Sequence, residues 1–295
     1  MQKVDLLLNK ISQRSQLQKK HIENLDKDTA FFKKFEGYLG VYLKYCAEVG
    51  KDINFLADSY IKECDSFTKD YMVFLKDGTC PTHSVNYVMR SVYTKRKRMQ
   101  EHLMGLFVTQ FLWVNHLKIN TFFMKNLKAK TSGIRRYLEA GAGHGLQLLE
   151  AMRLLKKSDI EVIDISAIAI EICKKIVEIS EIKKKIRFYD QDIFNFVPAK
   201  KFDCIMLGEV LEHVENPKEL LSKIRGLLRP AGSVFVSTCA NCPAIDHVHI
   251  FKDARYITET IQASGFNIES ELILPIGNMK STDALNYAAI LRNYE

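Results

Sequence analysis

One glycine-rich segment near the middle of the chain constrains the fold more than any other feature. Gly141 and Gly143 stand between an apolar run that ends at Ala140 and a helical pattern that begins near Leu146. Glycines let a backbone turn tightly and lie against a ligand, and the start of a helix directs free N–H groups towards it. Open parallel sheets bind ligands at such a turn. We therefore predict a ligand-binding loop between a strand and a helix.

After about residue 131, short β-branched runs alternate with amphipathic segments of helical length. The runs typical of strands span 134–140, 160–166, 186–190, 202–208, 232–238, 266–274 and 286–293. The segments typical of helices span 146–157, 167–180, 217–228 and 254–265. This alternation predicts crossover units on a parallel sheet, and the last two runs, joined only by a loop, predict an antiparallel hairpin at its edge. The predicted fold class is α/β, with a Rossmann-like, seven-stranded, mostly parallel sheet covered by helices on both faces.

The residues before this alternation follow a helical pattern. From about Phe31 to Lys128 the apolar residues recur at helical spacing, and one loop is expected around Gly78 and Pro81. We predict an all-helical domain over 1–130, which acts as a lid and acceptor-binding region, and a ligand-binding domain over 131–295. A predicted helix over 103–127 has enough apolar residues to pack on its own domain or to form a homodimer.

Charge and cysteine content bound the function classes. Residues 1–130 hold 22 Lys and Arg against 13 Asp and Glu, whereas 131–295 hold 21 against 22. A basic part can attract an anionic partner, although it more often reflects a solvated surface. Seven scattered cysteines and a start without an apolar leader predict a reduced, cytoplasmic protein. We expect no membrane span, because no run approaches about 18 uninterrupted apolar residues.

Two details describe the ligand of the glycine loop. Asp164 ends the second predicted strand, 19 residues after Gly145, where a carboxylate can accept both hydroxyl protons of a ribose. Position 146 is Leu, so the third glycine of the dinucleotide pattern is missing, and Glu139 places a carboxylate just before the loop. A negative charge there suits a ligand that carries an ammonium and a sulfonium group rather than a pyrophosphate.

Together these residues resemble class I S-adenosylmethionine-dependent methyltransferases over about residues 134–293. EAGAGHG resembles the first motif of that family, FDCIMLGEVLEHV the fourth-strand motif, and LLRPAG the turn before the fifth strand. The resemblance implies S-adenosylmethionine as cofactor. The cofactor-binding residues that it implies are Glu139, Gly141 and Gly143 for the methionine part, Asp164 for the ribose with Ile165 beside it, Asp192 and Ile193 for the adenine, and Gly208 and Glu209 near the methyl group.

The acceptor side is expected around the loop after the fifth strand. Methyl transfer from a sulfonium needs a general base only for some acceptors, and histidine is suited to that role. We expect His247 or His249 to be this base, oriented by Asp246; alternatively His247 faces solvent and His249 packs in the core. His213 is expected beside the acceptor or packed at a helix start.

A second set of candidate acceptor contacts lies in the helical part. Gln110, Trp113 and His116 are spaced three apart on one predicted helix and could line the pocket, or could equally form a helix–helix core. Cys239 and Cys242 form a CxxC pair beside His247 and His249, but the spacing matches no common zinc module. Because the pair follows a late strand, it does not resemble a redox motif either. We predict no metal.

The form of the fourth-strand motif is most similar to small-molecule O- and N-methyltransferases. It lacks both the Asn/Asp-Pro-Pro-aromatic sequence of base-amino methylation and the Pro-Cys motif of RNA cytosine methylation. We therefore expect a small-molecule acceptor from a natural-product or cofactor pathway and no nucleic acid. Three alternatives stay open: an RNA or protein methyltransferase that docks through the basic run Lys95–Arg98, C-methylation of a small molecule, and a non-catalytic module.

Overall fold

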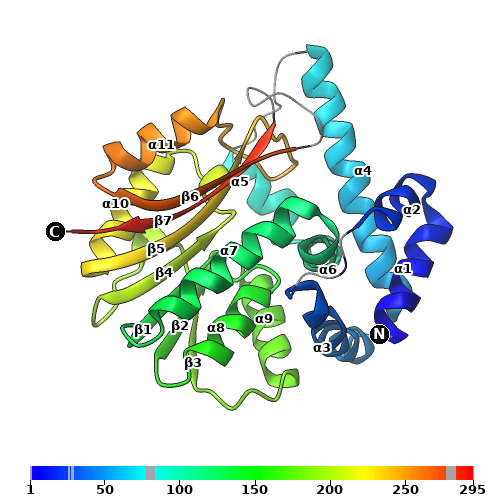
Figure 1. The fold of residues 1–295 in the computed structure, drawn as a ribbon, viewed down its shortest axis with the longest axis horizontal. Helices are drawn as coiled ribbons and strands as arrows, with labels where there is room; N and C mark the ends of the chain where they lie inside the picture. Colours follow the sequence, from blue (N-terminus) through cyan, green and yellow to red (C-terminus); the bar gives the residue numbers. More distant parts are fainter. Residues whose placement is uncertain (1, 26, 28–29, 78–83, 277–283, 295) are drawn as a thin grey trace.

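The computed structural model describes residues 2–25, 27, 30–77, 84–276 and 284–294 (Figure 1). The loop expected around Gly78 and Pro81 falls outside the described residues, as does most of the loop expected between the last two strands.

Helices make up most of the described part of the chain before residue 131. They are α1 (Gln2–Arg14), α2 (Gln16–Glu23), the short η1 (Phe32–Lys34), α3 (Phe35–Glu48), α4 (Ile53–Asp77), α5 (Val85–Val88), the π-helical turn η2 (Met89–Tyr93), α6 (Arg96–Leu112) and α7 (Val114–Lys130). In Figure 1, α1 to α4 gather on the side of the molecule opposite the chain's C-terminus. The predicted helical N-terminal region is confirmed.

The single helix predicted over 103–127 is wrong, because the chain breaks at Trp113. Trp113 has extended backbone angles (φ −88°, ψ 121°) and ends α6, and α7 then starts in a new direction. The bend lets α6 pack on α4 while α7 lies on the sheet, where the Phe123 ring stands 4.8 Å from that of Phe235. Neither Gly nor Pro marks the break, so the periodicity did not reveal it.

The sheet has seven strands in the order β3-β2-β1-β4-β5-β7-β6. The strands are β1 (Arg136–Ala140), β2 (Asp159–Asp164), β3 (Ile186–Asp190), β4 (Phe202–Gly208), β5 (Leu228–Ala240), β6 (Asn267–Pro275) and β7 (Leu285–Arg292). β1 to β5 pair in parallel, whereas β7 is antiparallel to both β5 and β6. The predicted fold class is confirmed, including the hairpin at the edge.

In the described part of the chain, four helices connect the parallel strands and the edge hairpin, and three of them begin at a side-chain cap. They are α8 (Leu146–Leu154), α9 (Ala167–Ile179), α10 (Pro217–Leu227) and α11 (Ala254–Ala263), with short turns η3 (Ile193–Asn195) and η4 (Leu211–His213). The side chains of Ser166, Asn216 and Asp253 accept a backbone N–H in the first turn of α9, α10 and α11. Each such bond satisfies a donor that would otherwise be left free at the start of the helix.

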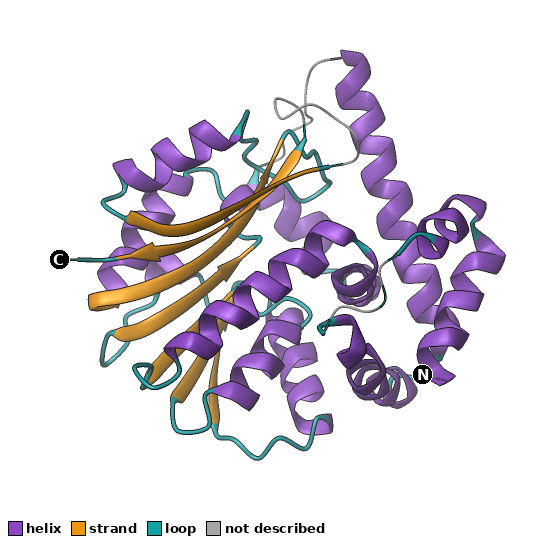
Figure 2. Ribbon diagram, viewed as in Figure 1, coloured by secondary structure: helices purple, strands orange, loops and turns teal. Residues whose placement is uncertain are grey.

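Helices cover both faces of the sheet (Figure 2). α10 and α11 share one apolar cluster with the inward side chains of one face. On the other face, a single apolar cluster joins α7, α8 and α9 to α1, α3, α4 and α6, and it includes Phe35, Phe107, Tyr137 and Leu149. The helical region therefore packs directly on the sheet layer, and α7 belongs to that layer. The boundary expected at 130/131 stays a prediction.

Candidate active site

A cavity of about 1200 Å³ lies at the carboxyl ends of β1, β2, β4 and β5. Its opposite wall comes from the helical region, with Glu63 on α4, His102 on α6 and His116 on α7. The crossover topology creates this position, because every parallel strand ends at the same edge of the sheet. Fifteen of the sixteen residues proposed from the sequence line this one cavity: Gln110, Trp113, His116, Glu139, Gly141, Gly143, Asp164, Ile165, Asp192, Ile193, Gly208, Glu209, His213, Asp246 and His247.

His249 is the exception, and its expected role as general base has no geometric support. It is not among the residues that line the cavity. Its ring packs 4.6 Å from the ring of Phe251 and 6.0 Å from that of Tyr256. The reason lies in the backbone, because the carbonyl of Glu212 accepts the N–H groups of both Val248 and His249 and turns the loop there. The ring therefore packs on aromatic side chains, although its Nε2 is buried without a hydrogen-bond partner among the described residues.

The glycine loop needs its glycines for two different reasons. Gly141 has φ +92°, and a Cβ there would stand 2.8 Å from Cγ2 of Val210. Gly145 caps α8 with φ +79° and lies against Cys173, which a Cβ would approach to 3.2 Å. Side chains would therefore strain the backbone and fill the space at the start of α8. At this helix start, the N–H of Gly145 donates to the carbonyl of Ala142 at 2.9 Å, and the N–H of Leu146 donates to Nδ1 of His144 at 3.2 Å.

Asp164 ties the end of β2 to the glycine loop. Its Oδ2 accepts the N–H of Ala142 at 2.8 Å and that of Gly143 at 3.4 Å, and its Oδ1 accepts the N–H of Ser166 at 2.7 Å. Burial raises the pKa of Asp164, and the three N–H donors oppose that change. The carboxylate thus orders the loop in addition to lining the cavity.

Two more acidic groups border the cofactor side. Glu139 is buried, its carboxylate accepts the hydroxyl of Tyr137, and burial raises its pKa to about 8. Asp192 accepts the N–H of Phe194 at 2.9 Å and so caps the turn η3 after β3. A cationic ligand would favour the ionised form of Glu139, because the charge of the buried carboxylate is otherwise uncompensated.

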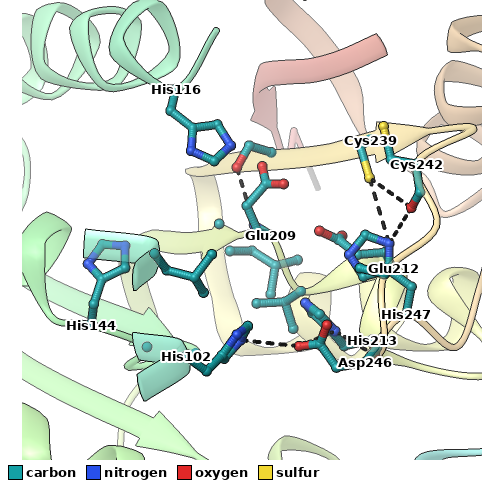
Figure 3. Close-up of a pocket in the computed structure, with 18 of the residues that line it drawn as sticks. His102, His116, His144, Glu209, Glu212, His213, Cys239, Cys242, Asp246 and His247 are labelled. Carbon is teal, nitrogen blue, oxygen red and sulfur yellow. Dashed lines mark hydrogen bonds and ion pairs between the residues drawn. The ribbon is translucent and has the colours of Figure 1, made fainter. Parts of the chain in front are cut away.

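A second group of polar side chains lies on the β4 and β5 side of the same cavity (Figure 3). Glu209 follows β4 with φ +50°, and its N–H donates to the carbonyl of Ser237 on β5 at 2.9 Å. Glu212 lies one turn later and accepts the hydroxyl of Thr238 at 2.7 Å. Burial raises the pKa of Glu209 to about 8, with the Glu212 charge as the next cause, and burial raises the pKa of Glu212 to about 7.

Two histidines complete this group, and a backbone carbonyl determines the tautomer of each ring. Nδ1 of His213 lies 2.8 Å from the carbonyl oxygen of Asp246, and Nδ1 of His247 lies 2.6 Å from that of Cys242. Because a carbonyl oxygen only accepts, each Nδ1 carries a hydrogen, and the neutral ring keeps its lone pair on Nε2. Burial lowers the pKa of His247 to about 4, so this ring is neutral at pH 7.

These residues include a donor set that can hold a metal ion. Among the described residues, ligand atoms of Glu212, His213 and His247 lie within 4.8 Å of one another, as do those of Glu209, Glu212 and Cys239. Oε1 of Glu209 and Oε1 of Glu212 are buried without a hydrogen-bond partner among the described residues. This donor set differs from the one formed by Cys239, Cys242, His247 and His249 in the sequence. Glu212 was not predicted, although the spacing E-x-x-E-H in GEVLEHV places Glu209, Glu212 and His213 about one turn apart.

A polar network joins the helical region to the start of α8. The side-chain amide of Asn120 donates to Oε1 of Gln110 at 2.7 Å, and the amide of Gln147 donates to Oδ1 of Asn120 at 3.0 Å. Nδ1 of His116 lies 3.0 Å from the hydroxyl of Thr109, and burial lowers the pKa of His116 to about 4. Gln110 lies on α6 and His116 lies on α7, so the prediction that one helix carries both residues is wrong. Both side chains nevertheless line the cavity.

Sequence reasoning also missed three residues that the helical region contributes. Nε2 of His102 lies 3.4 Å from Oδ2 of Asp246, and Nδ1 of His102 lies 3.1 Å from Oε1 of Glu63. The hydroxyl of Tyr93 lies 3.4 Å from the same Oδ2 of Asp246. No signal in the sequence marks these residues, because only the folded chain brings them to a loop more than a hundred residues later.

The strand order, the antiparallel β7 and the loop after β1 define a class I methyltransferase fold. The sequence profile of the family described as "Methyltransferase domain" matches residues 115–271, more than half of the chain. The chain belongs to this family of S-adenosylmethionine-dependent methyltransferases, and the predicted enzyme class and cofactor are confirmed. The match begins inside α7, the helix that packs on the sheet.

Comparison with known proteins gives distant relatives. The chain is 28% identical over 159 residues to a ubiquinone biosynthesis O-methyltransferase of Glaesserella parasuis, covering 51% of this chain and 65% of that protein. It is 28% identical over 101 residues to malonyl-[acyl-carrier protein] O-methyltransferase 2 of Ilyobacter polytropus, covering 34% and 38%. In these matches the chain spans less than two thirds of the relative's length.

Among solved structures, the N-methyltransferase NodS from Bradyrhizobium japonicum, in complex with S-adenosylhomocysteine, aligns with a TM-score of 0.50 at 18% identity. The alignment covers 68% of this chain and 98% of that one, and it supports the shared fold. Over the described residues, the structure contains no helix that combines the length and the apolar character needed to cross a bilayer.

Proposed function

We propose that this enzyme transfers the methyl group of S-adenosylmethionine to an oxygen or nitrogen atom of a small molecule held in the cavity. The observation that carries the proposal is the cavity itself, which is continuous from the glycine loop to the group around Glu212 and is walled by α4, α6 and α7. Pockets for one small ligand commonly measure about 300–1000 Å³. A volume of about 1200 Å³ leaves room for the cofactor together with a small acceptor.

The charge of the lining supports an acceptor that is neutral or cationic. Nine acidic residues line the cavity: Glu63, Glu139, Asp164, Asp192, Glu209, Glu212, Glu215, Glu219 and Asp246. Lys118 is the only Lys or Arg among the described lining residues. Burial raises the pKa of Glu139 and Glu209 to about 8, so these two carboxyl groups are mostly protonated at pH 7. The lining still disfavours carboxylates and phosphates, because its described residues offer an anion only one Lys as a partner where water is displaced.

The same charge distribution argues against the RNA alternative. A nucleic-acid substrate would have to bring phosphates to an acidic cavity. The basic run Lys95–Arg98 is also partly engaged within the chain. The guanidinium of Arg96 donates to both carboxylate oxygens of Glu171 at 2.6 and 2.8 Å, and that of Arg98 donates to the carbonyl of Ser91.

The polar group on the β4 and β5 side supplies a base for a hydroxyl acceptor. The neutral ring of His247 has its lone pair on Nε2, and His213 is held in the same tautomer, so either ring can take the proton of a hydroxyl as the methyl group is transferred. A neutral amine needs no such base. We propose that Glu139, Asp164 and Asp192 contact the cofactor, as expected from the sequence. These three residues line the same cavity at the ends of β1 to β3, on the other side of β4 from the polar group.

The same residues fit a divalent cation. Glu212, His213 and His247 combine carboxylate and imidazole donors, and the free Oε1 atoms of Glu209 and Glu212 lack any other described partner. The backbone carbonyls that bind Nδ1 of each ring orient them in the way that is common for metal ligands. A bound cation would lower the pKa of an acceptor hydroxyl that contacted it. The residues that would hold it are Glu212, His213 and His247, with Glu209 beside them, and this proposal departs from the prediction of no metal. A ring that binds the cation through Nε2 cannot take a proton on the same atom, so the cation and the histidine base are alternative ways to activate a hydroxyl.

The names of the relatives are consistent with methyl transfer to an oxygen or nitrogen atom. The matched proteins include O-methyltransferases, and the fold of NodS is that of an N-methyltransferase. These proteins differ in their acceptors. For this chain we therefore propose only the class of acceptor, which is a neutral or cationic compound with a hydroxyl or amine group. C-methylation stays the alternative for an acidic C–H acceptor, and a homodimer through the helical region stays a prediction.

The test has two stages. Calorimetry with S-adenosylmethionine, S-adenosylhomocysteine and NAD should show binding of the first two alone. A screen with methyl-labelled cofactor would then compare phenols, amines, carboxylic acids and bulk RNA as acceptors. We expect label in the phenol or amine set. Transfer to RNA or to carboxylic acids alone would contradict the proposal, and cofactor binding without transfer to any class would favour a non-catalytic module.

A further inference from the structure

A chain of alternating carboxylates and imidazoles crosses the cavity from the helical region to the acceptor side. Glu63 on α4 contacts Nδ1 of His102 at 3.1 Å, and Nε2 of His102 faces Oδ2 of Asp246 at 3.4 Å. The same Oδ2 lies 3.6 Å from Nδ1 of His213. Figure 3 shows the ring of His102 directed at Asp246, with His213 close to Asp246. The four groups come from four segments of the chain: α4, α6, the turn η4 and the loop after β5.

The close approach of two helices positions the first member of this chain. Gly105 on α6 lies one turn after His102, and a Cβ there would stand 2.4 Å from Cγ of Glu63 and 2.7 Å from the carbonyl oxygen of Ser59. The absent side chain lets α4 lie directly on α6 at this point. Glu63 is thereby held over the helix and reaches the ring of His102.

The middle of the chain is a buried ion pair. Side-chain exposure is 14% for His102 and 6% for Asp246. Burial alone would lower the pKa of His102, but the carboxylates of Glu63 and Asp246 raise it well above its ordinary value. His102 and Asp246 are thus largely shielded from water, and each provides the other with an ion-pair partner at 3.4 Å.

Asp246 in turn fixes the ring that faces the acceptor. Its carbonyl accepts the Nδ1–H of His213 at 2.8 Å, while its side chain bonds to His102 and lies near the hydroxyl of Tyr93. If the carboxylate of Asp246 lost His102, it would be left buried with a weaker set of partners. The carboxylate would then compete for Nδ1–H of His213, and both the backbone and the ring would move.

We propose that His102 and Glu63 are positioning residues for the methyl-transfer site, holding Asp246 so that Nε2 of His213 faces the acceptor. The helical region then contributes to the chemistry of the site as well as enclosing it. This inference rests on the proposed function, since it assigns a role at the same acceptor site. It adds two residues, from α4 and α6, that no sequence motif marks.

The experiment compares His102→Gln and Glu63→Gln with a matched control on the same two helices. Glu101→Gln removes the neighbouring α4–α6 ion pair, in which Lys62 Nζ lies 3.0 Å from Glu101 Oε1, and Glu101 does not line the cavity. For His102→Gln we expect kcat to fall by about 10- to 100-fold, as for partners of site histidines, with the KM for S-adenosylmethionine unchanged. Glu63→Gln should show a smaller fall, and Glu101→Gln none.

A spectroscopic measurement keeps the test independent of finding an acceptor. Nitrogen-15 NMR of the full chain, kept metal-free with a chelator, reports which nitrogen of His213 carries the proton. We expect the Nδ1–H form in the parent protein and a mixture of forms in His102→Gln. An unchanged His213 signal, or an equal loss of kcat in Glu101→Gln, would overturn the positioning role. Failure of every acceptor would instead count against the proposed function, while the NMR result would still decide this inference.

Discussion

The carboxylate of Asp164 accepts the backbone N–H of Ala142 at 2.8 Å, and so the last residue of β2 holds the glycine loop that follows β1. A second bond, from Gly143, uses the same oxygen. Ligand contacts at this point therefore depend on a loop whose shape a neighbouring strand maintains. A cofactor that approaches Asp164 meets a carboxylate whose position is already set, which limits the conformational entropy lost on binding.

Replacement of Asp164 by Ala should weaken the binding of S-adenosylmethionine. The variant loses the expected hydrogen bonds to the ribose and also the bonds that order Ala142 and Gly143. Hydrogen bonds to charged groups contribute about 1.5–3 kcal/mol, so affinity should fall roughly ten- to hundredfold by calorimetry. Asp190→Asn is the matched control, since Asp190 ends the adjacent strand, is exposed and does not line the cavity. Equal affinities in parent and Asp164→Ala would exclude the assigned contact.

Binding of S-adenosylmethionine should strengthen as pH rises towards 8. The free carboxyl of Glu139 has a pKa raised to about 8, so it is mostly protonated at pH 7, and a cationic ligand must displace that proton. Calorimetry in buffers of different ionisation enthalpy should detect proton release below pH 8. The amino group of the cofactor also titrates, near pH 7.7–8.0 for an α-amino group. Comparison with Glu139→Gln therefore separates the effect of Glu139 on the pH dependence from that of the amino group. An identical pH profile in Glu139→Gln would show that Glu139 does not face the cofactor.

Most of the sheet could be predicted from sequence because its signals are local. β2 is a buried run rich in β-branched residues, β4 is a buried apolar run, and the glycines around Gly141 mark a loop. Cofactor candidates such as Asp164 and Asp192 follow, because a residue at the end of a parallel strand must lie at the same edge of the sheet. Pattern and position are enough for these residues.

The acceptor side depends on tertiary contacts that no local pattern encodes. His249 and His247 lie two apart in one loop, and only the backbone bonds to the Glu212 carbonyl decide that one ring reaches the cavity while the other packs on Phe251. The break at Trp113 contains no helix-breaking residue type. His102 contacts Asp246 only because α6 lines the cavity at the carboxyl ends of the strands. This contact could not be predicted from one sequence.

The two loop histidines should differ in their effect on turnover. His247→Gln removes a neutral ring that lines the cavity, and kcat for a hydroxyl acceptor should fall by about 10²-fold or more if this ring is the base. His249→Gln changes a ring that packs outside the cavity and should leave kcat unchanged. Steady-state kinetics with saturating cofactor separates the cases. A large loss in His249→Gln with full activity in His247→Gln would reverse the assignment.

Divalent cations should bind the acceptor side. Calorimetry of chelator-treated protein with Mg²⁺, Mn²⁺ and Zn²⁺ should detect a site that Glu212→Gln removes, because this substitution takes away a carboxylate shared by both donor groups. Glu215→Gln is the control, since Glu215 also lines the cavity but belongs to neither group. The same cation affinity in Glu212→Gln and the parent would place the ion elsewhere, and no binding of any of the three would remove the cation from the mechanism.

Gly105→Ala should destabilise the contact between α4 and α6. The new Cβ would stand 2.7 Å from the Ser59 carbonyl oxygen, which belongs to the helix backbone and cannot rotate away. Overpacking of this kind costs about 1–3 kcal/mol in the free energy of unfolding. Gly37→Ala on α3 is the control, because nothing stands within 4 Å of its Cβ position, and alanine in a helix stabilises by up to about 1 kcal/mol. Chemical denaturation compares the two.

Because Glu63 lies over Gly105, the Gly105→Ala variant should also separate Glu63 from His102 and lower kcat, whereas Gly37→Ala should not. A Gly105→Ala protein as stable as the parent would show that α4 shifts at little cost, and the fixed position of Glu63 would then have another cause.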